Sequence, residues 1–406
     1  MSAQKRAPRR TALVEHIRSK IVAGELQPGA QLPSRAEMIG KFGACRATLQ
    51  DAFDELKLDG FVESRAGEGT FVTDNPPHLS RYGVVFGPDP SGVWRPFTFA
   101  LRREIPGIEK EQDCQFALYD NVTAHSDTVE YRELIRDVRS HRVAGLLFYG
   151  DVLQFGLLDT PLIANSGIPR VVLGAVPIEP ISHPGLVSIC IDDHAFFDRA
   201  LDHLHQRGRR RVALLEGWES SQEDISDFML RAERRGMTVK PHWILELSVK
   251  QARKVTELLL SLSAGERPDA LLLTSESLIE PVGAGILASD VQAGRDLDVV
   301  AICNMPCVGS TPVPMRRLGT DMRQRLRVAL DLLKSQFRGQ AVPPSVMLPP
   351  VFEEELSRPP KSPEGMAVTG RNCSVAARGD DVRYTELSEG RAFRWLGGKE
   401  CWDGRG

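Results

Sequence analysis

From residue 81 onward, short apolar runs alternate with amphipathic stretches whose apolar residues recur at helical spacing. Apolar runs of this length between helices are typical of strands in a parallel sheet that is buried on both faces. The series restarts at LVSICIDD (186–193) and continues to an amphipathic helix over 321–337. We therefore predict an α/β fold with two lobes, each a doubly wound parallel sheet, the second beginning at residue 186.

The first 73 residues follow a different pattern. Apolar spacing predicts helices over 11–24, 34–42 and 45–58, and the Gly-flanked segments 60–65 and 69–73 predict a tight hairpin. Ser34, followed three residues later by Glu37, has the spacing of a capping box. We expect Arg18 on the polar face of the first helix, and Arg46, Thr48 and Gln50 on the outer face of the third. The sequence predicts a helix-turn-helix with a wing, whose second helix fits the DNA major groove.

This N-terminal unit resembles the winged helix-turn-helix of the GntR family of bacterial transcription regulators. The resemblance rests on GELQPGAQLPS, FGACRATLQDAFDEL and DGFVESRAGEGTFV and covers about residues 11–73. It implies double-stranded DNA as a partner. The DNA-binding residues that it implies are Arg35, Cys45, Arg46, Thr48, Gln50, Arg65, Gly67 and Gly69.

The unit also departs from the family's pattern. Where the family usually reads Val-Ser-Arg-Thr-Thr-Val-Arg, residues 44–50 read ACRATLQ, and Glu68 stands where the wing is normally basic. Fewer phosphate contacts lower affinity and its salt dependence, so we expect an operator unlike the family's commonest one. We expect Arg46 to read guanine and Gln50 to read adenine. The alternative for both is a solvated helix face.

The remaining chain, over about residues 81–355, resembles the effector domains of the LacI family. The segments IDDHAFFDRALDHLHQRGRRRVALLEG and RPDALLLTSESLIEPVGAGILASDVQAGRDLDVVAICN carry this resemblance. It implies a two-lobed, periplasmic-binding-protein-like domain with a ligand cleft between the carboxyl ends of the strands. A GntR-type winged helix joined to a LacI-type sensor is the arrangement of the AraR-like regulators of sugar metabolism. The implied effector-binding residues are Phe97, Asp192, Asp224, Glu276 and Asn304.

Two features leave the nature of the effector open. Sugar-binding members usually present Arg where Asp224 stands, and losing a five-donor fork argues against a typical sugar pocket. Carboxylates and amides still bind hydroxyls, and a cationic or amine ligand is the other candidate. A core role is the alternative for Phe97. For the loop residues, the alternative is a solvated position in a sensor that has lost its ligand.

Composition narrows the function classes. A chain of 406 residues is long enough to form several domains, each with its own hydrophobic core. Its net charge of −3 means that it lacks the overall positive charge of proteins that bind nucleic acid over most of their surface. No apolar run approaches the roughly 20 residues of a membrane span. We therefore expect a cytoplasmic protein without membrane contact, whose seven scattered cysteines are reduced thiols. The sequence lacks Gly-x-Ser-x-Gly, P-loop, Gly-x-Gly-x-x-Gly and His-Glu-x-x-His motifs, so we expect no enzyme, cofactor or metal site.

These observations lead to one organisation and one function. We expect a winged helix over 8–73, a mobile linker over 74–80, an effector domain over 81–358 and a disordered tail over 359–406. The function expected is a transcription regulator, a repressor rather than an activator, that binds a palindromic operator as a homodimer under control of a sugar or other polar metabolite. The alternative is a constitutive DNA-binding protein with a vestigial ligand domain. An enzyme tethered to DNA is a third reading, which no motif supports.

Overall fold

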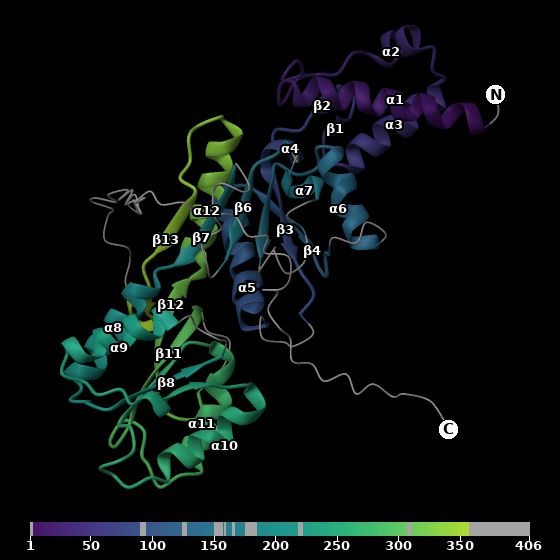
Figure 1. Cartoon of the computed structure of the whole chain (residues 1–406). Helices are drawn as coiled ribbons and strands as arrows, with labels where there is room; N and C mark the ends of the chain where they lie inside the picture. Colours follow the sequence, from purple (N-terminus) through teal and green to yellow (C-terminus); the bar gives the residue numbers. More distant parts are fainter. Residues whose placement is uncertain are drawn as a thin grey trace, which may run out of the picture. The chain divides into compact units, whose positions relative to one another are not determined.

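The computed structural model places a small winged helix before two six-stranded sheets (Figure 1). It describes residues 3–89, 95–123, 128–149, 157, 160–164, 167–174, 185–217, 222–306 and 311–356. The expected disordered tail over 359–406 lies outside these residues.

The winged helix packs three helices and a hairpin around one core. Its elements are α1 (Ala3–Val22), α2 (Arg35–Phe42), α3 (Arg46–Leu58), β1 (Val62–Arg65) and β2 (Gly69–Val72). The core side chains come from all three helices and the hairpin: Leu13, Val14, Ile17, Ile21, Met38, Leu49, Ala52, Phe53, Leu56, Phe61 and Val72. The helix-turn-helix and the wing predicted from sequence are therefore present.

Local signals explain where these helices begin and end. Ser34 and Glu37 form the predicted capping box: the Glu37 amide donates to Ser34 Oγ and the Ser34 amide to the Glu37 carboxylate. Gly43 then ends α2 in the left-handed conformation, with φ +56°. The expectation for Arg18 is wrong: its side chain is 2% exposed and pairs with Asp59 at 2.7 Å. A buried carboxylate attracts it to the inner face.

The first sheet is entirely parallel, with the strand order β13-β7-β6-β5-β3-β4. Its strands are β3 (Arg81–Phe86), β4 (Gln115–Tyr119), β5 (Gly145–Tyr149), β6 (Arg170–Leu173), β7 (Leu186–Ile191) and β13 (Ser345–Leu348). One face packs on α5 (Arg95–Gln112) and α12 (Met322–Phe337), and the other on α6 (Val129–Arg139) and α7 (Pro161–Ala164). The proline-rich segment before it, expected to be a linker, forms α4 (Pro77–Ser80), where Pro77 and His78 are buried.

The second sheet has the order β14-β12-β11-β10-β8-β9. Its strands are β8 (Val212–Glu216), β9 (Ile244–Glu246), β10 (Ala270–Leu273), β11 (Asp298–Met305), β12 (Arg316–Asp321) and β14 (Val351–Phe352). All pairings are parallel except β12 with β14, which is antiparallel. Helices α8 (Asp193–Gln206) and α9 (Gln222–Arg234) cover one face, and α10 (Val249–Leu260) and α11 (Ile279–Leu287) the other. The short helices η2 (Pro241–Trp243), η3 (Glu276–Leu278) and α13 (Glu353–Leu356) complete this part.

The chain passes between the two sheets after β7, after β12 and after β13. The sequence assignment of residues 186–191 and of the helix over 321–337 to the second lobe is therefore wrong, because β7 and α12 belong to the first. Apolar periodicity marks a buried strand or helix but not the sheet that it joins.

The expectation that all seven cysteines are reduced thiols is wrong for Cys303, which is disulfide-bonded.

Candidate DNA-reading surface and effector site

The N-terminal turn of α3 presents the predicted base-reading residues. Arg46 is its first residue and is exposed, as is Cys45, which precedes it as the N-cap. Gln50 is half-buried, and its Nε2 donates to Asp54 Oδ1 at 2.8 Å. The expectation that Thr48 faces outward is wrong, because Thr48 is 3% exposed and its Oγ1 lies 3.1 Å from Cys45 Sγ. It shares the apolar face, one residue before a core leucine.

The wing and the start of α2 carry the remaining predicted DNA contacts. Arg35 is exposed, with its guanidinium 5.8 Å from the centre of the Phe53 ring. Arg65 lies over the Phe71 ring, and its Nε donates to Glu63 at 2.8 Å, which partly neutralises its charge. The wing therefore offers less positive charge to phosphates than its arginine suggests.

Two glycines allow the tight turn of the wing. Gly67 has φ +78° and Gly69 has φ +129°, both in the region that side chains disfavour. Gln31 braces the turn, because its Nε2 donates to the Glu68 carbonyl at 2.7 Å and lies 2.8 Å from where a Cβ of residue 69 would stand. These glycines shape the wing rather than supply contacts through side chains.

The predicted effector residues follow strands of both sheets. Phe97 lies in α5, which follows β3, and its ring stacks on Tyr149 at the end of β5 with 3.9 Å between centres and 9° between planes. Asp192 follows β7 and caps α8, accepting a hydrogen bond from the Ala195 amide at 2.9 Å. Parallel strands end at one edge of a sheet, so these residues lie where α/β proteins bind ligands.

Asp193 is a carboxylate with a perturbed pKa at this edge. Burial, followed by the charges of Asp224 and Asp192, raises the pKa of Asp193 to about 6. The Asp193 side chain remains accessible to solvent although protein atoms surround it, and Asp224 is exposed. Accessible carboxylates that repel one another favour a ligand with hydroxyl or ammonium donors.

Glu276 and Asn304, from the second sheet, bind each other. The Asn304 amide and its Nδ2 both donate to Glu276 Oε2 at 2.9 Å, while Cys303 Sγ lies 3.4 Å from Glu276 Oε1. Burial raises the pKa of Glu276, although the Asn304 bonds act in the opposite direction. A ligand that binds here must compete with the hydrogen bonds that Asn304 already donates to Glu276.

Three residues that the sequence reasoning missed connect these groups. The charge of Arg325, in α12, acts on both Asp193 and Tyr149, and the charge of Glu276 also acts on Tyr149. Burial is the main reason that the pKa of Tyr149 lies well above its usual value. We call the whole group the effector cluster; its members are Phe97, Tyr149, Asp193, Asp224, Glu276, Asn304 and Arg325. The sequence did offer one signal for Arg325: it is a charged residue at a position where the helical spacing predicts an apolar, inward-facing side chain.

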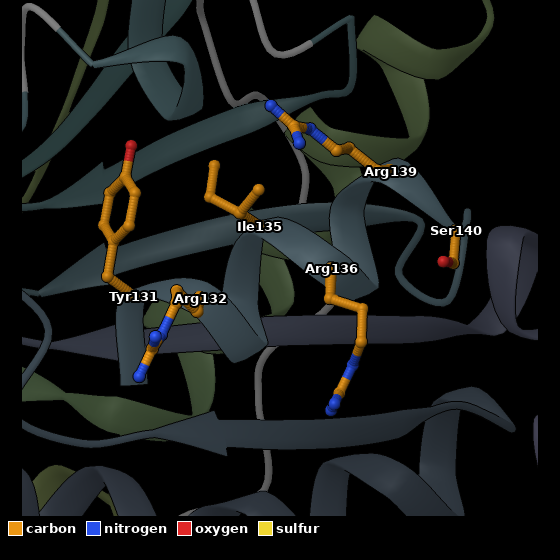
Figure 2. Close-up of a pocket in the computed structure, with 6 residues that line it drawn as sticks. All are labelled: Tyr131, Arg132, Ile135, Arg136, Arg139 and Ser140. Carbon is orange, nitrogen blue, oxygen red and sulfur yellow. The ribbon is translucent and has the colours of Figure 1, made fainter. Parts of the chain in front are cut away.

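Two pockets in the first sheet's domain lie elsewhere, and neither borders the effector cluster. One, of about 480 Å³, is formed by α6 and its C-cap, with Tyr131, Arg132, Ile135, Arg136, Arg139 and Ser140 as its lining (Figure 2). The other, of about 360 Å³, shares Ile135 and Arg139 with the first and is also lined by Val22 and His78. Within the described ranges no group of three or more His, Cys, Asp or Glu residues has the geometry of a metal site. No helix there is long and apolar enough to cross a membrane.

Comparisons with known proteins match both halves of this architecture. Residues 9–72 match the bacterial regulatory proteins of the gntR family, and residues 201–353 match the periplasmic binding protein-like domain. A LacI-family regulatory protein from Chloroflexus aggregans has the fold of the sheet-containing part, with a TM-score of 0.51 and 21% identity over 67% of this chain and 96% of that chain.

Similarity to individual regulators covers either the DNA-binding unit or most of the chain. The arabinose metabolism transcriptional repressor of Geobacillus stearothermophilus is 31% identical over 324 residues, which are 77% of this chain and 86% of the repressor. Others match over 70 residues: the chain spans 14% of the probable rhizopine catabolism regulatory protein MocR of Rhizobium meliloti, at 37% identity, and 26% of the putative HTH-type transcriptional regulator RmpR of Mycobacterium gastri, at 43%. The chain therefore belongs to the GntR family of bacterial transcription regulators, in the arrangement that joins a winged helix to a periplasmic-binding-protein-like domain.

Proposed function

We propose that this protein is a repressor that binds its operator through the winged helix and changes its DNA affinity when a small polar metabolite binds the effector cluster. The observation that carries the proposal is the presence, in one chain, of an exposed Arg46 at the start of α3 and of polar groups at the carboxyl ends of two parallel sheets. The name of the Geobacillus relative supports both repression and a sugar-like effector.

The operator is proposed to be palindromic and the protein a homodimer. A winged helix of this size contacts only a few base pairs, so two copies on a two-fold axis are needed to read a site of useful length. Both copies would place the Arg46 turn in successive major grooves. Ligand binding then acts by favouring one arrangement of the two sheets over another, which shifts the spacing of the two reading helices.

The first test is selection of bound duplexes from a random DNA pool by the purified full chain, followed by sequencing. We expect an enriched palindrome with half-sites about one helical turn apart, or a multiple of this. The Arg46→Ala variant is the matched control, because it keeps the fold and removes the one exposed guanidinium of the α3 N-terminal turn. A pool without any enriched sequence for the unmodified chain would contradict sequence-specific repression.

One observation favours the second candidate, a constitutive DNA-binding protein. Glu276 and Asn304 satisfy each other, as they would in a sensor that no longer takes a ligand. The two candidates differ in one measurement, the affinity of the selected operator with and without a panel of sugars, sugar acids and amines. A change of tenfold or more with one compound supports a ligand-responsive repressor, whereas equal affinity across the panel supports the constitutive protein.

A further inference from the structure

Arg325 is a buried cation without a carboxylate partner among the described residues. Its side chain lies on α12 between the apolar residues Met322 and Leu326, and the residue is 4% exposed. Two hydrogen bonds join its Nη2 to the carbonyls of Gly174 and Ile189, both at 3.4 Å, which is long for such bonds. Its Nε is buried and has no hydrogen-bond partner among the described residues. The guanidinium therefore retains an unused buried donor.

The surroundings place this guanidinium inside the effector cluster. Gly174 follows the last residue of β6, so Arg325 binds at the carboxyl edge of the first sheet. Its guanidinium carbon lies 5.4 Å from the centre of the Phe97 ring. Tyr149 stacks on the same Phe97 ring, with 3.9 Å between the ring centres, and Asp193 forms no ion pair with Arg325 within 4 Å in the described part.

An unpaired buried cation costs free energy in the unliganded protein. Burial lowers the pKa of Arg325 to about 10, which still leaves it charged at neutral pH. A methionine would fill the same position of an apolar helix stripe without that penalty. A residue that lowers the stability of the fold is expected to be retained where it serves a function. We therefore look for the anionic partner of Arg325 in a ligand rather than in the protein.

We propose that Arg325 binds a carboxylate of the effector, so that the effector is a sugar acid rather than a neutral sugar. This inference rests on the proposed function and names the ligand class of the same site. A planar guanidinium with free donors matches a carboxylate, and a bond of this kind is strong away from water. The hydroxyl groups of the sugar acid face the acceptors Asp224 and Glu276, which belong to the second sheet's domain.

The charges of the cluster are divided between the two sheets. Its cation, Arg325, lies on α12 in the first sheet's domain, whereas Asp224 lies on α9 in the second sheet's domain. A ligand carrying its negative charge at one end and hydroxyls at the other would span both.

The test compares matched ligand pairs by thermal unfolding of the full chain. D-galacturonate, D-glucuronate and D-gluconate are each measured against their neutral counterparts D-galactose, D-glucose and D-glucitol at equal concentration and ionic strength. We expect at least one acid to raise the Tm by several degrees while its neutral counterpart does not. If no acid stabilises the protein more than its counterpart does, the proposal is overturned.

Two variants separate a ligand contact from a structural role. In Arg325→Met we expect the unliganded Tm to be unchanged or higher and the affinity for the stabilising acid to fall at least 30-fold. Arg327→Met, two residues along on the exposed side of α12, is the matched control and should retain that affinity. A Tm several degrees lower in Arg325→Met, or an unchanged affinity for the acid, would show that Arg325 serves packing alone. Operator affinity of the unmodified chain is measured separately without any sugar acid. Operator binding without a preference for an acid would contradict this inference alone, whereas absent operator binding would contradict the proposed function.

Discussion

Asp59 is the residue whose substitution should most disturb the winged helix. It ends α3 with a side chain that is 4% exposed, and its two oxygens contact Arg18 Nη2 at 2.7 Å and Arg142 Nη2 at 2.6 Å. Arg18 belongs to α1 and is 2% exposed, whereas Arg142, in the loop before β5, is 20% exposed. Asp59→Asn keeps the shape of the side chain but removes the buried carboxylate from both guanidinium groups. Among the described carboxylates, Arg18 then retains only Glu15, at 2.8 Å, which is 58% exposed and therefore screened by water, and Arg142 retains only Asp137, at 3.3 Å. Breaking a buried pair in this way typically costs about 3–5 kcal/mol.

Hydrogen exchange followed by mass spectrometry measures this loss locally. Because each 1.4 kcal/mol is a factor of ten, peptides from α1 and α3 should exchange roughly 150- to 4000-fold faster in Asp59→Asn. Arg142→Met is the matched control: it keeps the contact of Asp59 with Arg18, and we expect less than a tenfold change in the same peptides. A change below tenfold in Asp59→Asn would refute the reasoning, because it would mean that the desolvation cost of the ion pair cancels its attraction.

Three further predictions concern the DNA-binding half. Arg46→Ala should weaken binding to the selected operator by about 1–3 kcal/mol in a fluorescence anisotropy titration, whereas Lys57→Ala, at the opposite end of α3, should not; equal losses would indicate a general charge effect. His78 is buried against Phe61 with its pKa lowered to about 4, so it stays neutral while the unfolded chain gains a proton, and stability should fall by about 3 kcal/mol as the pH drops from 6.5 to 4. Urea titrations at both pH values should show this fall reduced in His78→Phe. Gly69→Ala forces a side chain to φ +129°, at a cost of about 1–3 kcal/mol, and should speed exchange in the wing; unchanged exchange would mean that the turn can rearrange.

The N-terminal half was largely predictable because its signals are local. The capping box at Ser34 and the glycines of the wing act within a few residues of chain, and each is present in the structure as expected. The failures there were Arg18 and Thr48, which lie on inner helix faces despite their polarity. Arg18 pairs with Asp59, 41 residues away, which local spacing cannot reveal, whereas Thr48 contacts the Cys45 thiol at the three-residue spacing of an N-cap and N3.

The effector cluster was predictable only in part, since its members come from distant segments of the chain. Phe97, Asp224, Glu276 and Asn304 stay predicted effector residues, which we group in the cluster. Asp192 caps a helix, and its neighbour Asp193 has the perturbed pKa. Arg325 was missed because α12 was assigned to the wrong sheet. Strand β12 was missed as well, because its sequence RRLGTD lacks the continuous apolar run of a buried strand.

The crossings between the two sheets bear on how this chain emerges from the ribosome. The last strand of the winged helix ends at Val72, whereas β13 and β14, which complete the edges of the two sheets, lie at 345–352. At about 5–20 residues per second, the nascent chain has a complete winged helix for roughly 14 to 55 seconds before either sheet can close. During that interval the winged helix is present without a complete copy of either sheet. A chain truncated before residue 345 would stay in this state, so under the proposed function we expect it to contact DNA weakly and without a response to a metabolite.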